Sequence, residues 1–188
     1  MPQLVFLDAN VIFSRVLRDW VLMLCASTRG EIFTLATSED VLAEAVARLR
    51  DRYPAAPSGL VENLRDKVRD YVDEMVTGYP GGEVGWIADE GDWHVHHAAL
   101  HYGAQILLTQ DAGFASDETP YEAQSCDQLF CRIDDAAPAA VREVVAMQAR
   151  HWAAKSGSRQ LPDVLRAADC PAFADRVQSH LRGLALRR

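Results

Sequence analysis

Residues 4–13 have the sequence LVFLDANVIF, and the hydrophobic pattern changes at Asp8. Leu4 to Leu7 form a short, continuous apolar run with branched and aromatic side chains, which is typical of a buried strand. From Ala9 onward the apolar residues follow helical spacing, and this pattern continues until Gly30. The stretch therefore predicts a buried strand that ends in an acid and leads directly into a helix at residues 9–29.

The same alternation of strand and helix continues along the chain. Further strands are expected at residues 31–36 (EIFTLA), 83–87 (EVGWI), 104–109 (AQILLT) and, as an edge strand, 122–126 (EAQSC). Helical spacing is present at residues 37–53, 60–76, 92–102 and 128–133. Because strands that alternate with helices imply a parallel sheet with right-handed crossovers, we expect an α/β fold with a central parallel sheet of about four or five strands.

Polar residues and glycine mark where some of these helices should begin and end. Thr37 or Ser38 is a suitable N-cap for the helix that follows the second strand, and acids occupy the first turn of that helix. Asp127 is a suitable N-cap for the helix at 128–133. Gly103 is expected to end the helix that begins near Asp92.

From about Pro138 onward the sequence predicts only helices. Residues 138–155 begin with a proline at a first-turn position, residues 156–160 (SGSRQ) have the composition of a linker, and residues 161–188 predict two short helices. We therefore expect two parts, an α/β domain at residues 1–135 and an all-helical C-terminal extension at residues 136–188.

Charge is distributed unevenly along the chain. The net charge at pH 7 is −8, but residues 1–131 carry 9 Lys and Arg against 21 Asp and Glu, whereas residues 132–188 carry 10 against 6. This difference has two interpretations. It is either ordinary variation of the surface or a basic tail that contacts nucleic acid or an acidic partner.

Composition disfavours membrane and secreted proteins. No apolar run approaches the ~20 residues that span a bilayer, and the first residues lack the basic segment of a signal peptide. The four cysteines lie without CxxC spacing, so that a zinc knuckle is not expected. A reduced, cytoplasmic setting without a membrane partner is the simplest interpretation.

Four acidic side chains fall near the ends of the expected strands. Asp8 closes the first strand, and Asp111 lies two residues after the fourth. Asp92 begins the helix after the third strand, and Glu44 lies about two turns into the helix after the second, beside its apolar stripe. Because ligands of open α/β sheets bind beyond the carboxyl ends of the strands, we expect these four carboxylates to converge.

Convergence of four carboxylates has a chemical consequence. Such groups repel one another, so the site holds either protons at raised pKa values or divalent cations. Ligation by oxygen alone selects Mg²⁺ or Mn²⁺ over zinc, and these ions activate water for attack on a phosphoryl group. Each acid also has an ordinary structural interpretation, as a helix cap, a first-turn charge, a surface charge or a turn former. Their joint placement at one edge of the sheet favours the metal site.

Histidines gather around Asp92, in DEGDWHVHHAALH at residues 89–101. On an ideal helix His94, His97 and His101 share one stripe, which faces away from Asp92. We interpret this stripe as a solvated face or as a surface covered by the C-terminal helices rather than as a second metal site. His96 is expected on the side of Asp92, as a candidate for substrate contact or for support of the acids.

Four segments resemble, in order, the four signature segments of PIN-domain ribonucleases, and in particular of VapC-like toxins of toxin–antitoxin modules. They are FLDANVIFS (6–14), TSEDVLAEAVARL (37–49), DEGDWHVHHAAL (89–100) and ILLTQDAGF (106–114). The resemblance covers roughly residues 3–133, and the basic tail is similar to a C-terminal extension in some VapC-like toxins. It implies a PIN-like three-layer α/β/α fold with an all-helical extension.

The resemblance also implies roles for particular residues. Four residues match the metal-binding acids of the family: Asp8, Glu44, Asp92 and Asp111. Three others match supporting positions: Asn10, Thr109 and Ser38. The chain departs from many relatives at Gly113, where they carry a further acid. The fourth role at the metal site therefore falls to Asp111, with Asp117 as an alternative.

The implied activity is that of a Mg²⁺- or Mn²⁺-dependent endoribonuclease, which hydrolyses phosphodiester bonds in RNA. The implied protein partners are a cognate antitoxin, which plugs the acidic groove, and a second copy of the chain in a homodimer. Arg15, Arg18 and His96 are candidates for contact with the RNA.

Other classes of function also place acids after strands. A haloacid-dehalogenase-type phosphatase needs a second Asp two residues after the first, where this chain has Asn10. A receiver domain that accepts phosphate needs a lysine after a late strand, and the only lysines, Lys67 and Lys155, follow no expected strand. A non-catalytic PIN-like module that binds RNA or protein stays open as the alternative.

Overall fold

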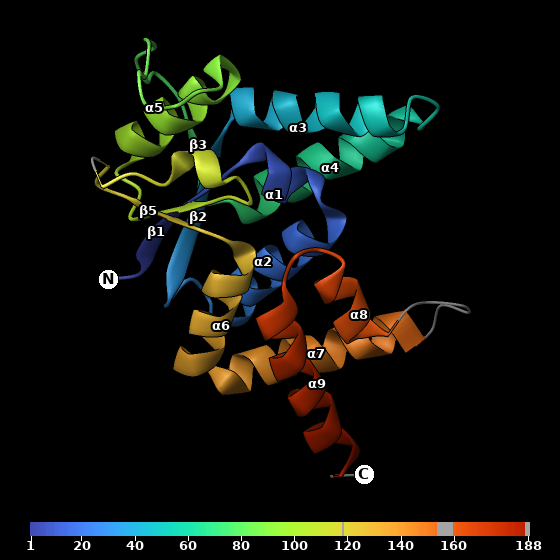
Figure 1. The fold of residues 1–188 in the computed structure, drawn as a ribbon. Coiled ribbons are helices and arrows are strands. Elements are labelled where there is room, and N and C mark those ends of the chain that lie inside the picture. Colours follow the sequence, from blue (N-terminus) through green and yellow to red (C-terminus); the bar gives the residue numbers. More distant parts are fainter. Residues whose placement is uncertain (118, 154–159, 187–188) are drawn as a thin grey trace.

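The computed structural model describes residues 1–117, 119–153 and 160–186, and its centre is a single parallel sheet (Figure 1). The five strands are β1 (Gln3–Leu7), β2 (Phe33–Ser38), β3 (Glu74–Val76), β4 (Ile106–Leu108) and β5 (Glu122–Gln124). They lie in the order β3-β2-β1-β4-β5, and every neighbouring pair is parallel. The expected α/β class with a parallel sheet is therefore confirmed.

Helices lie on both sides of this sheet. They are α1 (Ala9–Phe13), α2 (Arg15–Ser27), α3 (Glu39–Arg52), α4 (Ser58–Tyr71), α5 (Trp93–Tyr102), α6 (Cys126–Ala136), α7 (Pro138–Ala153), α8 (Leu161–Arg166) and α9 (Pro171–Ala185), with 3₁₀ turns η1 (Glu90–Asp92) and η2 (Ala112–Phe114). Figure 1 shows α5 on one side and α2 and α6 on the other, which is compatible with three layers. Within the described residues, none of these helices has the length and apolar character needed to cross a membrane.

The strand order reverses beside β1. From β1 the chain adds β2 and then β3 on one side, whereas β4 and β5 are added on the other side. The order therefore reverses between β1 and β4, which makes this pair the switch point where open α/β sheets bind ligands. Asp8 and Thr109, the residues directly after β1 and β4, lie at this edge.

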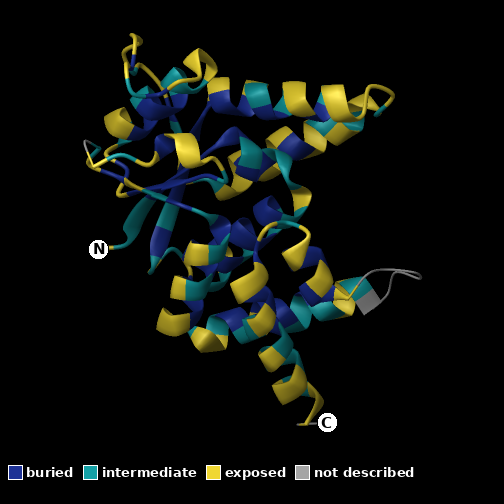
Figure 2. Ribbon diagram, viewed as in Figure 1, coloured by how far each residue is buried: buried dark blue, intermediate teal, exposed yellow. Residues whose placement is uncertain are grey.

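The buried core continues from the sheet into the C-terminal helices (Figure 2). Phe173 of α9 lies edge-on to Trp20 of α2, with ring centroids 5.0 Å apart, and 5.2 Å from the ring of Phe130 on α6. Arg176 of α9 binds the carboxylate of Asp135, at 2.5 Å and 3.2 Å. The extension thus shares the hydrophobic core of the α/β part.

One expected helix is two helices. The sequence predicts a continuous helix from residue 9 to residue 29, but α1 ends at Phe13 and α2 begins at Arg15. Ser14 separates them with an extended backbone, at φ −69° and ψ 110°, and its hydroxyl accepts a hydrogen bond from the amide of Leu17. Apolar residues continue across the break because both helices bury apolar side chains, such as Val11 and Ile12 on α1 and Leu17 on α2.

The third strand lies elsewhere than expected. Residues 83–87 form a turn rather than a strand, closed by a hydrogen bond from the amide of Ile87 to the carbonyl of Val84. Both of these apolar side chains are buried, which explains the misleading pattern. The strand is instead β3, within the predicted helix 60–76. It begins two residues after the C-cap of α4, Val72. Between them, the carboxylate of Asp73 accepts a hydrogen bond from the amide of Leu35 on β2.

The capping predictions divide in the same way. Ser38 is the N-cap of α3, as predicted, and Gly103 ends α5 in a left-handed conformation with φ 71°. Asp127 is not the N-cap of α6, because Ser125 and Gln128 form a capping box there. The carboxylate of Asp127 instead accepts the amides of Ala172 and Phe173 at the start of α9.

The two predicted short helices of the tail are present as α8 and α9, and α7 matches the predicted helix that begins at Pro138. The predicted linker at 156–160 lies outside the described residues except for Gln160.

Replacing Phe173 with alanine tests whether α9 and the sheet share one core. We expect the free energy of unfolding to fall by about 3–5 kcal/mol, because a large buried ring is lost between two aromatic neighbours. Leu186→Ala is the control, since this leucine is 88% exposed just after α9. Chemical denaturation followed by circular dichroism measures both variants. An equal, small effect of the two substitutions would contradict the shared core.

Candidate functional site

Asp8 is fixed at the switch point by a network of hydrogen bonds. Its side chain is only 3% exposed. Oδ1 accepts the amide of Ala9 at 2.5 Å, and Oδ2 accepts the side chains of Asn10 and Thr109, each at 2.6 Å. A carboxylate has about four lone-pair positions, so that one position on Oδ1 stays open to a ligand.

Asn10 and Thr109 have no unused hydrogens in this network. The amide group of Asn10 donates to Asp8 and, at 3.0 Å, to the hydroxyl of Thr109, and its oxygen accepts the amide of Gln110. The hydroxyl of Thr109 donates to Asp8 and also accepts the amide of Asp111 at 3.0 Å. Since all these positions are occupied, both side chains have one orientation and hold the carboxylate of Asp8 in place.

Asp111 is exposed on the turn that follows β4. Its Oδ1 accepts the amide of Gly113 at 2.7 Å, which caps the short helix η2. A Cβ at position 113 would lie only 3.2 Å from that oxygen. Glycine at this position therefore leaves room for the carboxylate of Asp111. Asp117, the alternative acid, is exposed in the loop before β5.

Asp92 has the most informative ionisation in the site. Partial burial is the largest cause of its raised pKa of about 6, and the charges of Asp8, Asp89, Asp111 and Glu44 also raise it. Burial is also the main cause of the raised pKa of Asp8, with a contribution from Glu44. The acids predicted from the sequence are thus within electrostatic reach of Asp92, in spite of their separation along the chain.

Asp89 is an acid that the sequence argument missed. Its carboxylate accepts the amide of Gly91 at 2.8 Å and so caps η1. Its charge also acts on Asp92, three residues later. The signal was present in the repeated acids of residues 89–92, but a capping role and a role in the site give the same pattern.

Glu44 lies between a cation and a histidine. Its Oε1 is 2.6 Å from Nη2 of Arg48, one turn further along α3. Its Oε2 is 3.6 Å from Nε2 of His94 on α5. The prediction that the stripe of His94 faces away from the acids is therefore wrong for His94, because α3 packs beside α5 on that side.

The other histidines and Ser38 have structural surroundings. His96 is buried and its Nδ1 lies 2.7 Å from the hydroxyl of Tyr121, so its ring offers little surface to an RNA. Nε2 of His97 donates a hydrogen bond to the carbonyl of Gly82 at 2.9 Å. Ser38 supports the site indirectly, because its hydroxyl accepts the amide of Val41 and so fixes the start of the helix that carries Glu44.

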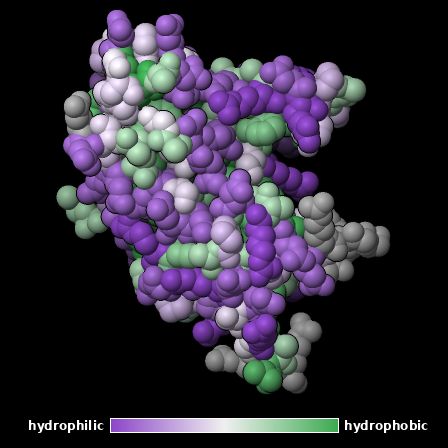
Figure 3. All heavy atoms as spheres, viewed as in Figure 1, coloured by the Kyte–Doolittle hydropathy of each residue, from purple (hydrophilic) through white to green (hydrophobic). Residues whose placement is uncertain are grey.

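A basic cavity of about 940 Å³ lies between the α1–α2 junction and helices α3 and α4, at the end of α3 that follows Glu44 in the chain. Its cationic side chains are Arg15, Arg18, Arg52 and Lys67. On α3 the residues Glu44, Arg48 and Arg52 follow one another at intervals of four, so that one side of this helix leads from the acids to the cavity. In Figure 3 the surface is mostly hydrophilic over α3 and is notched beneath its outer end.

The two arginines named from the sequence differ in this cavity. Arg15 is exposed, 3.7 Å from Asp19. Arg18 is buried, and its Nη1 donates to the carbonyl of Ile12 at 2.8 Å, which ties α2 to the end of α1. Arg52 was not named from the sequence, and its exposed side chain has no hydrogen bond or ion pair within the described part of the chain.

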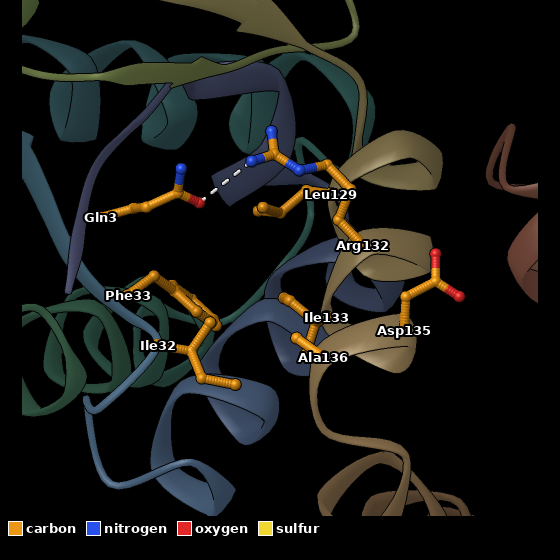
Figure 4. Close-up of a pocket in the computed structure, with 8 residues that line it drawn as sticks. All are labelled: Gln3, Ile32, Phe33, Leu129, Arg132, Ile133, Asp135 and Ala136. Carbon is orange, nitrogen blue, oxygen red and sulfur yellow. Dashed lines mark hydrogen bonds between the residues drawn. The ribbon is translucent and has the colours of Figure 1, made fainter.

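A second cavity, of about 400 Å³, lies at the opposite end of the sheet (Figure 4). It is bounded by Gln3 and Phe33, the first residues of β1 and β2, and by α6. Figure 4 shows Arg132 reaching across to Gln3, to which it donates at 3.3 Å, while Asp135 points away. This cavity lacks convergent acids and is separate from the switch point.

The described ranges, 1–117, 119–153 and 160–186, contain no group of three or more His, Cys, Asp or Glu side chains arranged to hold a metal ion. The donors that do gather at the switch point are mainly carboxylate oxygens. Together with the parallel sheet, they define an α/β protein with an acidic centre at the carboxyl edge of β1 and β4. In comparisons with known proteins, no family model, curated protein or solved structure matches the chain.

Asp92→Asn should raise the thermal stability of the metal-free protein at pH 7.5. The pKa of Asp92 lies above its ordinary value of 3.8, so that stability from the protonated form is present below pH 4 and is lost as the pH rises through about 6. We expect a rise in Tm of roughly 2–4 °C, after allowance for solvent screening at this partly exposed group.

Differential scanning calorimetry in EDTA at pH 5 and pH 7.5 measures this effect. The side chain of Asp92 makes no capping hydrogen bond, so the substitution removes charge without removing a contact. Asp70→Asn, at an exposed acid on α4, is the matched control. If Asp92→Asn and Asp70→Asn shift Tm alike at both pH values, the acids do not repel one another as described.

Proposed function

We propose that the chain is a divalent-metal-dependent endoribonuclease with a PIN-like fold, the toxin of a VapBC-type toxin–antitoxin pair. One observation carries the proposal: Asp8, Glu44 and Asp111, from three separate segments, all raise the pKa of Asp92 at the switch point of a parallel sheet. Repulsion between these carboxylates destabilises the metal-free protein, and a bound cation would remove it. This favours a cation-binding site over a purely structural role of the acids.

Mg²⁺ or Mn²⁺ is the cofactor that suits these residues. Mg²⁺ keeps several waters and binds through one or two carboxylates, which agrees with an open site. Asp8 offers a free position on Oδ1, and Oε2 of Glu44 is buried without a hydrogen-bond partner among the described residues. When bound, such an ion activates water for attack on phosphorus and offsets the negative charge of the phosphoryl group.

The side chains of the site have distinct tasks in this proposal. Asp8 is held by Asn10 and Thr109 and presents a fixed oxygen. Asp92, whose pKa is about 6, exchanges its proton for the cation near that pH. Cation binding should therefore weaken as the pH falls below about 6.

RNA is the substrate class that the surroundings favour. The acids alone would repel a polyanion, but the cavity further along α3 carries Arg15, Arg52 and Lys67 at its surface. Lys67 and Arg15 share one acid, Asp19, at 2.9 Å and 3.7 Å, which leaves Arg52 free for a phosphate. An extended strand could thus contact the cations of the cavity while one phosphate lies at the acids. The antitoxin, the homodimer and the cytoplasmic setting belong to the same proposal and rest on the resemblance of the four segments.

The direct test is cleavage of total RNA by the purified chain with Mg²⁺ or Mn²⁺. We expect products with 5′-phosphate and 3′-hydroxyl ends, identified by sequencing of the ends. Asp8→Asn should lower the rate by at least about 100-fold, because it removes charge from the fixed oxygens. Asp70→Asn should cleave like the wild type.

Two other outcomes would refute the endonuclease. Wild type that cuts no RNA, and that behaves like Asp8→Asn with either metal, leaves no catalytic site. RNA binding without cleavage would favour the alternative, a non-catalytic PIN-like module.

Arg52→Gln tests the proposed path of the RNA. In an Asp8→Asn background, which blocks cleavage, the loss of one phosphate contact should reduce the slope of log K against log salt by about 0.7. Fluorescence anisotropy with a short single-stranded RNA measures the slope. Arg65→Gln is the control, at an exposed arginine of α4 that does not line the cavity. Identical slopes for the two variants would exclude the cavity from the path.

A further inference from the structure

Two buried polar atoms face each other beside the acids. Nε2 of His94 and Oε2 of Glu44 lie 3.6 Å apart, and neither has a hydrogen-bond partner among the described residues. Their separation exceeds the ~2.7–3.2 Å of an N–H···O hydrogen bond. Buried polar atoms are nearly always satisfied, so an unsatisfied pair that converges on one point indicates a third participant.

The hydrogen bond of the other ring nitrogen, Nδ1, determines the tautomer of His94. Nδ1 lies 2.7 Å from the carbonyl oxygen of Gly91. Because a carbonyl can only accept, Nδ1 carries the hydrogen. In the neutral ring, Nε2 then directs a lone pair toward the carboxylate of Glu44. A ring held by Nδ1–H on a backbone carbonyl is the usual arrangement of a metal-binding histidine.

Glu44 is oriented to match this nitrogen. Arg48 holds its Oε1 at 2.6 Å, which leaves Oε2 as the oxygen that faces α5. The two helices that carry Glu44 and His94 pack against each other, so the pair is fixed by the fold rather than by chance contact of long side chains. His94 lies two residues after Asp92, at the start of α5.

We propose that His94 and Glu44 are both ligands of one divalent transition cation, through Nε2 and Oε2. Bonds of ~2.0–2.2 Å from each atom would together exceed the 3.6 Å between them, so one ion can reach both. Water completes the coordination. An imidazole ligand favours a first-row transition ion over Mg²⁺. This site should therefore bind Mn²⁺ more tightly than Mg²⁺. The inference rests on the proposed function, since Glu44 belongs to the same set of acids.

Pulsed EPR of the Mn²⁺-loaded protein tests the nitrogen ligand directly. The electron spin-echo modulation of wild type should contain the coupling of a directly bound ¹⁴N, and labelling with ¹⁵N-histidine should replace it with the ¹⁵N pattern. His94→Gln should lack the coupling. His101→Gln is the matched control and should retain it, because His101 is exposed on the same helix, seven residues further on.

Titration calorimetry tests the preference between metals. His94→Gln should weaken Mn²⁺ binding by at least ~10-fold and Mg²⁺ binding by less than about 3-fold, since Mg²⁺ selects oxygen. If the variant does not fold, the measurement on ¹⁵N-histidine-labelled wild type alone decides the question.

Two results would overturn the inference, and they separate it from the proposed function. Mn²⁺ bound to wild type without any nitrogen coupling, together with cleavage of RNA, would mean that His94 only forms an ion pair with Glu44 while the endonuclease stands. Wild type that binds no Mn²⁺ and cleaves no RNA would refute both proposals.

Discussion

The hydrogen bonds that join Asp8, Asn10 and Thr109 are the interaction on which the site depends. They join the carboxyl ends of the adjacent strands β1 and β4, and Asn10 and Thr109 use their side-chain hydrogens within the network. This arrangement has two effects. It keeps a buried carboxylate ionisable by surrounding it with donors, and it places Asp111 through the hydroxyl of Thr109. The strand order makes this edge the switch point, because strands are added on one side of β1 up to β3 and on its other side from β4 onward.

Repulsion between carboxylates is the second constraint. Glu44 of α3 and Asp92 at the start of α5 lie within electrostatic reach of Asp8, and burial and the neighbouring acids raise the pKa of Asp92 to about 6. Arg48 offsets part of the charge, but it is held by one oxygen of Glu44. The metal-free site therefore carries more negative charge than its surroundings neutralise. Our proposal of a divalent cation follows from this imbalance, and in the same proposal the cationic side chains of the cavity along α3 contact the polyanion.

Much of this arrangement could be predicted from local patterns. The apolar run before Asp8 marks a central strand because both of its faces are buried, and the carboxyl ends of parallel strands must share one edge. The pattern failed at residues 83–87, where Val84 and Ile87 are buried by a turn rather than by a strand. It failed again at β3, a three-residue edge strand whose position depends on Asp73 and β2.

Tertiary neighbours account for the remaining differences at the site. Ideal helix angles place the stripe of His94 away from Asp92, but they do not say which helix lies on that side. That helix is α3, which brings Glu44 to His94. Asp127 is a second residue whose role depends on a distant neighbour. Its position in the sequence suits a cap of α6, but its carboxylate caps α9, which lies more than forty residues further on.

The central claim is that the acids at the switch point bind a divalent cation. Anomalous diffraction from a crystal soaked in Mn²⁺ tests it most directly. The account predicts one or more anomalous peaks within bonding distance of carboxylate oxygens of Asp8, Glu44 or Asp92. Peaks confined to His97, His101 or other surface residues, with none at these acids at millimolar Mn²⁺, would contradict it.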